Sequence, residues 1–289
     1  MRFISTPPAL AISLLLGLGG CNSADTSSAP QDGGTAVETP APENNDTLFT
    51  DPELNAYYAT ALEQNGSALK AALHAIVRTA TRLSYDEVYI LMTESDRDMT
   101  NLDENDIVLF YSRRAVPADD KCHTDATGCW NREHLWPKSL GVGYDDTVAC
   151  YTDMHHLYPA DAQVNRDRSN RRFAPSSTPY PGIDGLYYDD ASWSWEPQDA
   201  IKGDVARALL YMTVRYEGEG NEPDLELLPH DDSAERPADL CTMLAWNRLD
   251  PVSSREQRRN DTVYFYQENR NPFIDRPEWA DDLYAAACE

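Results

Sequence analysis

The sequence predicts an α+β protein, a predominantly helical single domain with a small β-sheet. Apolar residues recur three and four positions apart over 53–83 and again over 201–216, which is the spacing of amphipathic helices. Between these stretches, the short continuous apolar run Ile107–Tyr111 indicates a buried strand. The chain has no internal repeat and no second linker, so one mixed domain over 50–289 is the simplest organisation.

The other elements follow from similar patterns. Gly66-Ser67 divides the first helical stretch into two helices, and further helices are expected over 85–93, 239–247 and 255–269. The aromatic residues of 187–195 favour core or loop packing, with base stacking as the alternative. The polar motif at 267–277 favours a structural role, because buried amides and arginines commonly satisfy loop backbone groups; substrate contact by Arg270 is the alternative.

The N-terminus carries a targeting pattern. Arg2 precedes the apolar run Ala9–Leu18, which is too short to span a bilayer, and the run ends in Leu18-Gly19-Gly20-Cys21. This ending resembles a bacterial lipobox, which implies cleavage before Cys21 and lipid attachment to its sulfur. A plain secretory signal with a coincidental cysteine is the alternative.

The predicted division of the chain is a signal peptide over 1–21, a disordered tether over 22–49 and a globular domain over 50–289. The tether is rich in Ser, Ala, Pro, Gly and acidic residues, a composition that cannot bury enough apolar surface to fold. We expect export to the outer membrane or cell surface, with possible release to the medium. The membrane would be contacted through the lipid anchor only.

Charge limits the partners of the protein. The net charge is -25, because 49 acidic residues outnumber 24 basic ones. Such a chain cannot coat nucleic acid along its whole surface, so a polyanion would need a locally basic patch and cations. The segment Arg166–Arg172 is such an exception, with four arginines against one aspartate, a local charge of +3. This favours phosphate contact over a merely solvated face.

The cysteines suit an oxidising compartment. Apart from Cys21, five remain, so two disulfides and one free thiol are expected. Pairing of Cys122 with Cys129 closes the shortest loop, and pairing of Cys241 with Cys288 would tie down the C-terminus, but spacing alone leaves the connectivity open. The chain contains no C-x-x-C motif, which argues against a thiolate zinc site.

Most of the reactive side chains lie in two stretches, Asn131–Pro137 (NREHLWP) and Met154–Phe173 (MHHLYPADAQVNRDRSNRRF). Hydrolysis of a phosphodiester needs a base, a hard cation on the phosphate and positive charge for the transition state. The candidates are His134 as the base and Glu133 with Asn165 as hard oxygen ligands for magnesium. Glu133 and His134 would alternate faces on a strand, so a bend or a partner must bring them together.

Other residues of these stretches have predicted supporting roles. Asn165 would lie on the second turn of a helix that opens at Pro159. His155 and His156 are expected to support the site rather than bind the ion, because extra imidazoles would favour zinc or copper. Arg168 is the first candidate for transition-state charge, with Arg132 second, and Asn170 is expected to cap the helix. The predicted substrate-binding residues are Arg132, Arg166, Arg171 and Arg172.

Taken together, NREHLWPKS and MHHLYPADAQVNRDRSNRRF resemble the bacterial endonuclease I family, exported DNA and RNA nucleases of the His-Me finger (ββα-metal) class. The resemblance extends to LSYDEVY, KGDVARALLYMTVRY and RRNDTVYFYQENRNPFIDRPEW, and so covers about 53–284. It implies a His-Me finger core in which His134 is the base, Glu133 the metal carboxylate and Asn165 the metal amide. Some members have His-Asn-Leu where this chain has His155-His156-Leu157.

The expected function is therefore that of an exported, metal-dependent, non-specific endonuclease. Its substrates would be DNA and RNA, its products would carry a 5′-phosphate, and its cofactor would be Mg²⁺ or another hard divalent cation such as Mn²⁺ or Ca²⁺. No protein partner is expected, and the chain would act as a monomer. The rival functions are a phosphodiesterase for smaller esters and a surface nucleic-acid-binding lipoprotein without turnover. A serine hydrolase is poorly supported, because the chain has no G-x-S-x-G elbow.

Overall fold

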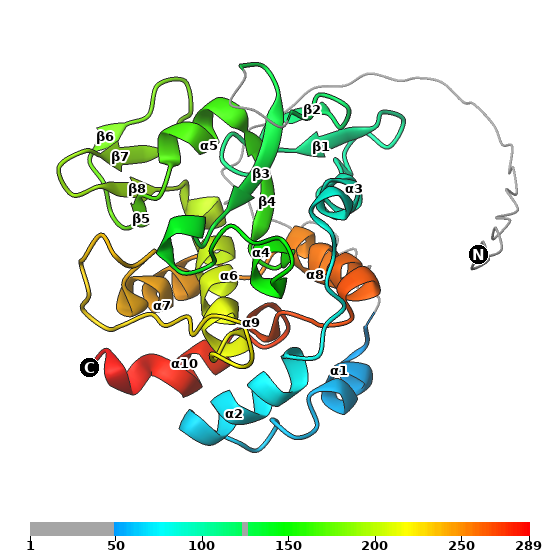
Figure 1. Cartoon of the computed structure of the whole chain (residues 1–289), viewed down its shortest axis with the longest axis vertical. Coiled ribbons are helices and arrows are strands. Elements are labelled where there is room, and N and C mark those ends of the chain that lie inside the picture. The colour runs from blue at the N-terminus through cyan, green and yellow to red at the C-terminus, as the bar shows by residue number, and fades with distance from the viewer. Residues whose placement is uncertain (1–48, 123–126) are drawn as a thin grey trace, which may run out of the picture. The chain divides into compact units, whose positions relative to one another are not determined.

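The computed structural model describes residues 49–122 and 127–289, which form a mixed helical and sheet structure, as expected (Figure 1). The predicted signal peptide, the lipidation at Cys21 and nearly all of the predicted tether lie outside the described residues. The helices are α1 (Asp51–Tyr57), α2 (Gly66–Val77), α3 (Tyr85–Ser95), α4 (Ala149–Thr152), α5 (Ala162–Arg168), α6 (Lys202–Arg215), α7 (Leu240–Leu249), α8 (Ser254–Gln267), α9 (Pro272–Asp275) and α10 (Trp279–Tyr284). The strands are β1 (Asp106–Val108), β2 (Ala115–Pro117), β3 (Trp130–His134), β4 (Leu157–Asp161), β5 (Arg172–Phe173), β6 (Thr178–Pro179), β7 (Tyr187–Asp189) and β8 (Ser194–Glu196).

The first helices begin at polar capping residues. Thr50 and Glu53 form a capping box at α1, and Ser84 and Glu87 form another at α3. Two helices precede α3, as predicted, but the break lies at 58–65, and Gly66 begins α2 instead of separating the helices. None of the helices in 49–122 and 127–289 is both long and apolar enough to cross a membrane.

The strand expected over 107–111 is shorter than predicted. β1 ends at Val108 and pairs antiparallel with β2, while the next three residues are buried without belonging to a strand. The chain turns there, because the amide of Arg113 donates to the carbonyl of Leu109 at 3.0 Å. The turn also lets the amide of Phe110 donate to the carbonyl of Pro159 at 2.8 Å and leaves Tyr111 in the core.

Strands β3 and β4 pair antiparallel, and α5 follows β4 directly and packs against both strands (Figure 1). In this register His134 lies opposite Leu157 and Arg132 lies opposite Pro159. The predicted helix start at Pro159 is wrong, since α5 begins three residues later at Ala162. Proline is tolerated at this strand position, where its carbonyl still accepts a hydrogen bond from the backbone amide of Phe110 in a neighbouring segment.

Helix α6 is the central helix of the fold and packs against α2 and α7. The sequence predicted one buried face, but every residue from Lys202 to Arg215 is buried. Its charged side chains are paired: Arg207 donates to both carboxylate oxygens of Glu256, at 2.7 and 2.8 Å. The helices predicted around 239–247 and 255–269 are present as α7 and α8.

A four-stranded sheet lies beside α5, in the order β5-β8-β7-β6, with β5 and β8 parallel and the other pairs antiparallel. The aromatic residues predicted to pack lie on β7 and β8 and in the turn between them. Trp195 is 1% exposed, whereas Tyr187 and Tyr188 are half-buried.

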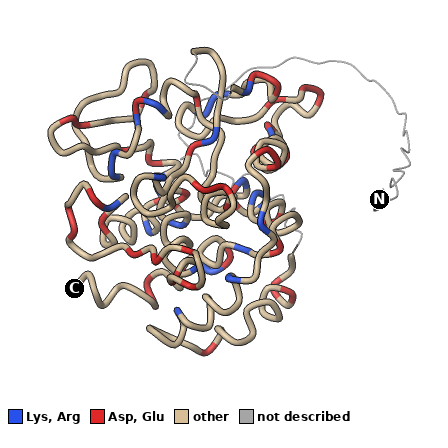
Figure 2. Tube along the Cα trace, viewed as in Figure 1, with Lys and Arg blue, Asp and Glu red and all other residues tan. Residues whose placement is uncertain are grey.

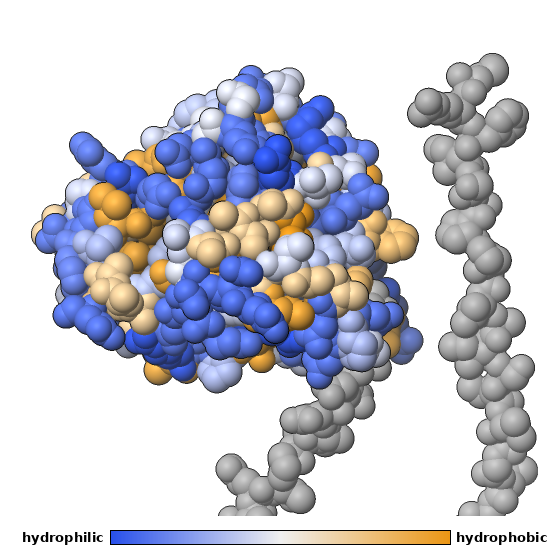
Figure 3. Space-filling model, turned by 90° about the horizontal axis from the view of Figure 1, so that it is seen from below, coloured by the Kyte–Doolittle hydropathy of each residue, from blue (hydrophilic) through white to orange (hydrophobic). Residues whose placement is uncertain are grey.

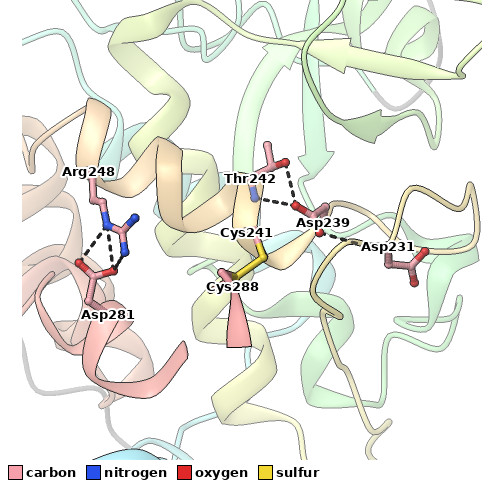
Figure 4. Close-up of a disulfide and its surroundings, with 7 residues drawn as sticks. All are labelled: Asp231, Asp239, Cys241, Thr242, Arg248, Asp281 and Cys288. Carbon is pink, nitrogen blue, oxygen red and sulfur yellow. Dashed lines mark hydrogen bonds and ion pairs between the residues drawn. A yellow bond between two sulfur atoms is a disulfide. The ribbon is translucent and has the colours of Figure 1, made fainter. Parts of the chain in front are cut away.

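Two disulfides are present, as expected, and they join Cys122 with Cys129 and Cys241 with Cys288, the two pairings considered from the sequence; Cys150 is a buried free thiol. Figure 4 shows the second bridge between α7 and the C-terminal segment, near the ion pair of Arg248 with Asp281.

The structural interpretation of the 267–277 motif is confirmed. Arg270 is 2% exposed and forms ion pairs with Asp261 and Asp275, both at 2.7 Å.

Charged residues are spread along the described part of the chain. Acidic and basic segments alternate along the trace of the described residues (Figure 2). The face seen in Figure 3 is hydrophilic over much of its area, with hydrophobic patches between. Scattered exposed apolar residues of this kind are normal on soluble proteins.

Candidate active site

The three residues predicted to form the centre of the site line a single open pocket of about 460 Å³. Glu133 and His134 come from the end of β3, and Asn165 comes from α5. The ββα arrangement brings them together, because α5 packs across the two paired strands. Residues more than thirty positions apart thus face one cavity.

His134 is 5% exposed and its ring is fixed by one hydrogen bond. Its Nε2 lies 3.0 Å from the carbonyl oxygen of Tyr151. A carbonyl can only accept, so Nε2 carries the proton and Nδ1 keeps its lone pair. Burial lowers the pKa of His134 well below its usual range, and the charges of His156 and Lys138 act in the same direction. The imidazole is therefore neutral at neutral pH and able to accept a proton through Nδ1.

Glu133 is 2% exposed and is held through one carboxylate oxygen. Tyr111 donates to Oε1 at 2.7 Å, and the guanidinium of Arg168 lies 3.1 Å from the same atom. Burial raises the pKa of the Glu133 carboxyl, and Arg168 and Tyr111 oppose that rise. Both of these side chains bind Oε1, and the backbone of His134 hydrogen-bonds the carboxylate as well.

Asn165 is oriented through its amide nitrogen. Nδ2 donates to Oδ1 of Asn131 at 2.7 Å and to the carbonyl of Arg132 at 3.1 Å. With the nitrogen engaged by β3, Oδ1 is the atom left for a ligand.

This donor set fits a hard divalent cation. Glu133 offers a carboxylate oxygen and Asn165 an amide oxygen on the same pocket. Magnesium is commonly bound by one or two protein oxygens, with water and substrate phosphate completing its shell. Across 49–122 and 127–289 there is no group of three or more His, Cys, Asp or Glu side chains that could hold an ion. A thiolate or multi-histidine site is therefore not present in that part of the chain.

The arginines predicted to touch substrate separate into two groups. Arg132 and Arg166 line the pocket. The guanidinium of Arg132 lies 3.2 Å from the ring centroid of Tyr85 and 3.9 Å from that of Tyr89, so it is held flat against the pocket wall. Arg166 is exposed.

Two predictions need correction at this pocket: transition-state charge from Arg168, and phosphate contact by Arg171 and Arg172. Arg168 is fully buried and donates to the carbonyls of His134 and Leu135, at 2.9 and 2.8 Å. Arg171 binds Asp190 at 2.6 Å, and Arg172 donates to the carbonyl of Asp231 at 2.8 Å. None of the three lines the pocket: Arg168 and Arg172 donate to backbone carbonyls, and Arg171 pairs with an exposed carboxylate.

His155 and His156 lie outside the pocket and are buried, at 1% and 0% exposure. Nε2 of His155 lies 3.1 Å from the carbonyl of Asn269, and Nε2 of His156 lies 2.8 Å from that of Cys150. The His156 ring stands 5.4 Å from the ring of His134. Burial lowers the pKa of each to about 4, so both are neutral and brace the segment behind His134.

Sequence reasoning missed Lys138 and the tyrosines of the pocket. Lys138 and Tyr85 both line it, and Tyr151 holds the base. The ammonium of Lys138 lies 5.6 Å from the ring centroids of both Tyr144 and Tyr151. Two sequence features could have identified them: Lys138 directly follows NREHLWP, and Tyr85 lies within LSYDEVY.

An accessible pocket that joins a neutral buried histidine, two hard oxygen ligands and several cations is the kind of site that hydrolytic nucleases use. The chain belongs to the endonuclease I family, whose model, Endonuclease I, matches residues 65–278. It is accordingly an endonuclease.

Several characterised proteins are similar to the chain. An extracellular ribonuclease of Bacillus amyloliquefaciens is 44% identical over 256 residues, which are 87% of this chain and 85% of the relative. An extracellular ribonuclease of Bacillus subtilis (strain 168) is 43% identical over 80% of this chain and 79% of its own. An extracellular deoxyribonuclease of Aeromonas hydrophila is 33% identical over 43% of this chain and 49% of its own.

Proposed function

We propose that the chain is an exported, metal-dependent, non-specific endonuclease that hydrolyses phosphodiester bonds in DNA and RNA. One observation carries the proposal: His134 keeps Nδ1 unprotonated in the same pocket that Glu133 and Asn165 line. Similarity to relatives named ribonuclease and deoxyribonuclease supports both substrates. The order β3, β4, α5 supports assignment to the His-Me finger class.

The residues of the chain have distinct parts in this reaction. His134 accepts a proton from water at Nδ1 as the water attacks phosphorus, and the hydrogen bond from Nε2 to Tyr151 holds the ring while its charge rises. Arg132, Lys138 and Arg166 attract the phosphate into the pocket. Arg168 fixes Glu133 and the end of β3, and so acts as a positioning residue.

Glu133 and Asn165 would hold the cation, Mg²⁺ or another hard ion such as Mn²⁺ or Ca²⁺. When bound, such an ion supplies positive charge that stabilises the phosphoryl transition state and the departing 3′ oxygen. Departure of the 3′ oxygen leaves a 5′-phosphate on the product. Contacts to phosphate and sugar carry little base information, which favours weak sequence preference.

Export is supported by the extracellular relatives and by the apolar segment that ends at Cys21. We propose that Cys21 carries a lipid and that the nuclease domain acts as a monomer outside the cytoplasm. Radiolabelled palmitate incorporation by wild-type protein and its loss in Cys21→Ser test the anchor separately from the nuclease.

The decisive experiment is digestion of supercoiled plasmid by the purified protein with and without EDTA. His134→Ala should stop cleavage while DNA binding in a gel-shift assay persists, and His230→Ala, at an exposed position outside the pocket, should cut normally. Conversion of closed circles to new ends excludes an enzyme limited to small esters. Undiminished cleavage by His134→Ala would remove His134 as the base.

A further inference from the structure

A second pocket, lined by Asp167 of α5 and by residues that follow this helix, has chemistry that the hydrolytic site does not use. It measures about 490 Å³, within the range of roughly 300–1,000 Å³ typical of small-ligand sites. Three aromatic side chains line it, Tyr180, Tyr188 and Trp195, together with Arg171, Asp167 and Asp190. We name it the aromatic pocket.

The rings of the aromatic pocket contact one another edge to face. The centroid of Tyr180 lies 5.3 Å from that of Trp195 and 6.3 Å from that of Tyr188. Tyr180 and Tyr188 are half-buried, so each keeps part of its ring open to a ligand. Aromatic faces of this kind bind nucleobases by stacking.

Its polar groups exclude a phosphate and suit a neutral base. Two carboxylates, Asp167 and Asp190, face one guanidinium, that of Arg171, which already binds Asp190 at 2.6 Å. An anionic phosphate would meet an excess of negative charge there. The side chain of Asp190 is 73% exposed and binds Arg171 through Oδ1, so Oδ2 can accept hydrogen bonds from a ligand. Guanine presents adjacent N–H donors on one edge, which a carboxylate matches.

The aromatic pocket is physically connected to the hydrolytic site. Arg166 lines one pocket and its neighbour in α5, Asp167, lines the other. The indole of Trp193 donates to Oδ1 of Asn170 at 2.8 Å, and Asn170 lines the hydrolytic pocket. The same ring stacks on Arg171 at 3.9 Å. Trp193 holds a left-handed backbone, with φ of 51°, which is uncommon for a bulky residue.

We infer that the aromatic pocket binds one unstacked base of the strand whose phosphate lies in the hydrolytic pocket, and that it favours guanine. This rests on the proposed function, because the ligand is part of the same substrate. Phosphates are drawn to the cations of one pocket, and a neighbouring base enters the other and stacks on the open part of the Tyr188 ring. The base contact would bias cleavage toward bonds at a fixed offset from guanine.

The test is cleavage of 5′-labelled single-stranded thymidine oligonucleotides that contain one guanine, moved one position at a time. Wild-type protein should cut the bond at one fixed offset from the guanine roughly 5- to 10-fold faster than the others, which corresponds to the stacking of one base. Tyr188→Ala should lose this enhancement and keep its rate at the other bonds. Asp190→Asn should lower the preference for guanine over adenine at that offset.

Tyr187→Ala is the matched control, because Tyr187 is the adjacent half-buried tyrosine of β7 and does not line the aromatic pocket. It should keep the full enhancement. Cleavage by wild-type protein that ignores the position of guanine would overturn the inference, as would Tyr188→Ala protein that still follows it. Neither result touches the assignment of His134 as the base, which fails separately if His134→Ala remains active.

Discussion

The guanidinium of Arg168 lies 3.1 Å from Oε1 of Glu133, and neither side chain is exposed by more than 2%. A buried carboxylate of this kind depends on its partner, because removal of one charge leaves the other desolvated and unpaired. The same guanidinium also satisfies the carbonyls of His134 and Leu135. One arginine thus ties a predicted metal ligand to the backbone that carries the base.

Arg168→Met should therefore unfold more easily. We expect a loss of about 3–5 kcal/mol in the free energy of unfolding, the cost of breaking a buried pair. Urea denaturation at pH 7 measures it. Arg166→Met is the control, since Arg166 is exposed and its replacement should change stability by no more than about 0.5 kcal/mol. A fully stable Arg168→Met protein that binds DNA poorly would show instead that Arg168 contacts the substrate.

Lys138 should contribute to substrate binding rather than to stability. It lines the pocket and is partly exposed. Lys138→Ala should lower kcat/KM on DNA roughly 10-fold or more, in keeping with loss of a charge-assisted phosphate contact. The slope of log affinity against log salt should fall by about 1. Lys121→Ala, which removes an exposed lysine outside the pocket, should leave both quantities unchanged. An unchanged salt slope for Lys138→Ala would show that this lysine does not contact a phosphate.

Cation binding can be measured without turnover. A ligand that binds the folded state raises the melting temperature, by an amount that depends on its concentration relative to Kd. Addition of Mg²⁺ or Mn²⁺ should raise Tm of the wild-type protein. Glu133→Gln and Asn165→Ala should reduce this shift because each removes one of the two oxygen ligands. Equal shifts in wild type and both variants would place the ion elsewhere.

The centre of the site was predictable because its residues fall in two local motifs. His134, Glu133 and Asn165 were identified from NREHLWP and the stretch around Asn165, and the fold brings them to one pocket. Arg168 was assigned to transition-state charge because a sequence shows charge but not burial. Pro159 was placed in a helix because proline suits both a first helical turn and certain strand positions. The choice between them depends on pairing with β3, a contact between segments about twenty residues apart.

The expectation of only one buried face on α6 and the failure to identify Lys138 have a related explanation. The 3.6-residue pattern identifies a helix but not how many neighbours cover it, and α6 is covered on all sides. A single lysine after a proline has no periodicity or motif of its own. Lys138 becomes a candidate because it lines the pocket, and the pocket forms only when β3 and α5 pack together.

Acid should destabilise the protein through His155 and His156. Burial holds the pKa of each at about 4, against about 6.5 in the unfolded chain, so between these values the unfolded state binds more protons. The two neutral rings therefore make their full contribution to the free energy of unfolding above about pH 6.5, and this contribution is lost as pH falls toward 4. Each ring accounts for up to about 3 kcal/mol, from the shift at 1.36 kcal/mol per pKa unit. Urea denaturation from pH 4.5 to 7.5 should show this slope, and His156→Asn, which removes one titrating ring, should flatten it. A stability that stays constant or rises on acidification across this range would mean that the two imidazoles are not buried in the neutral form.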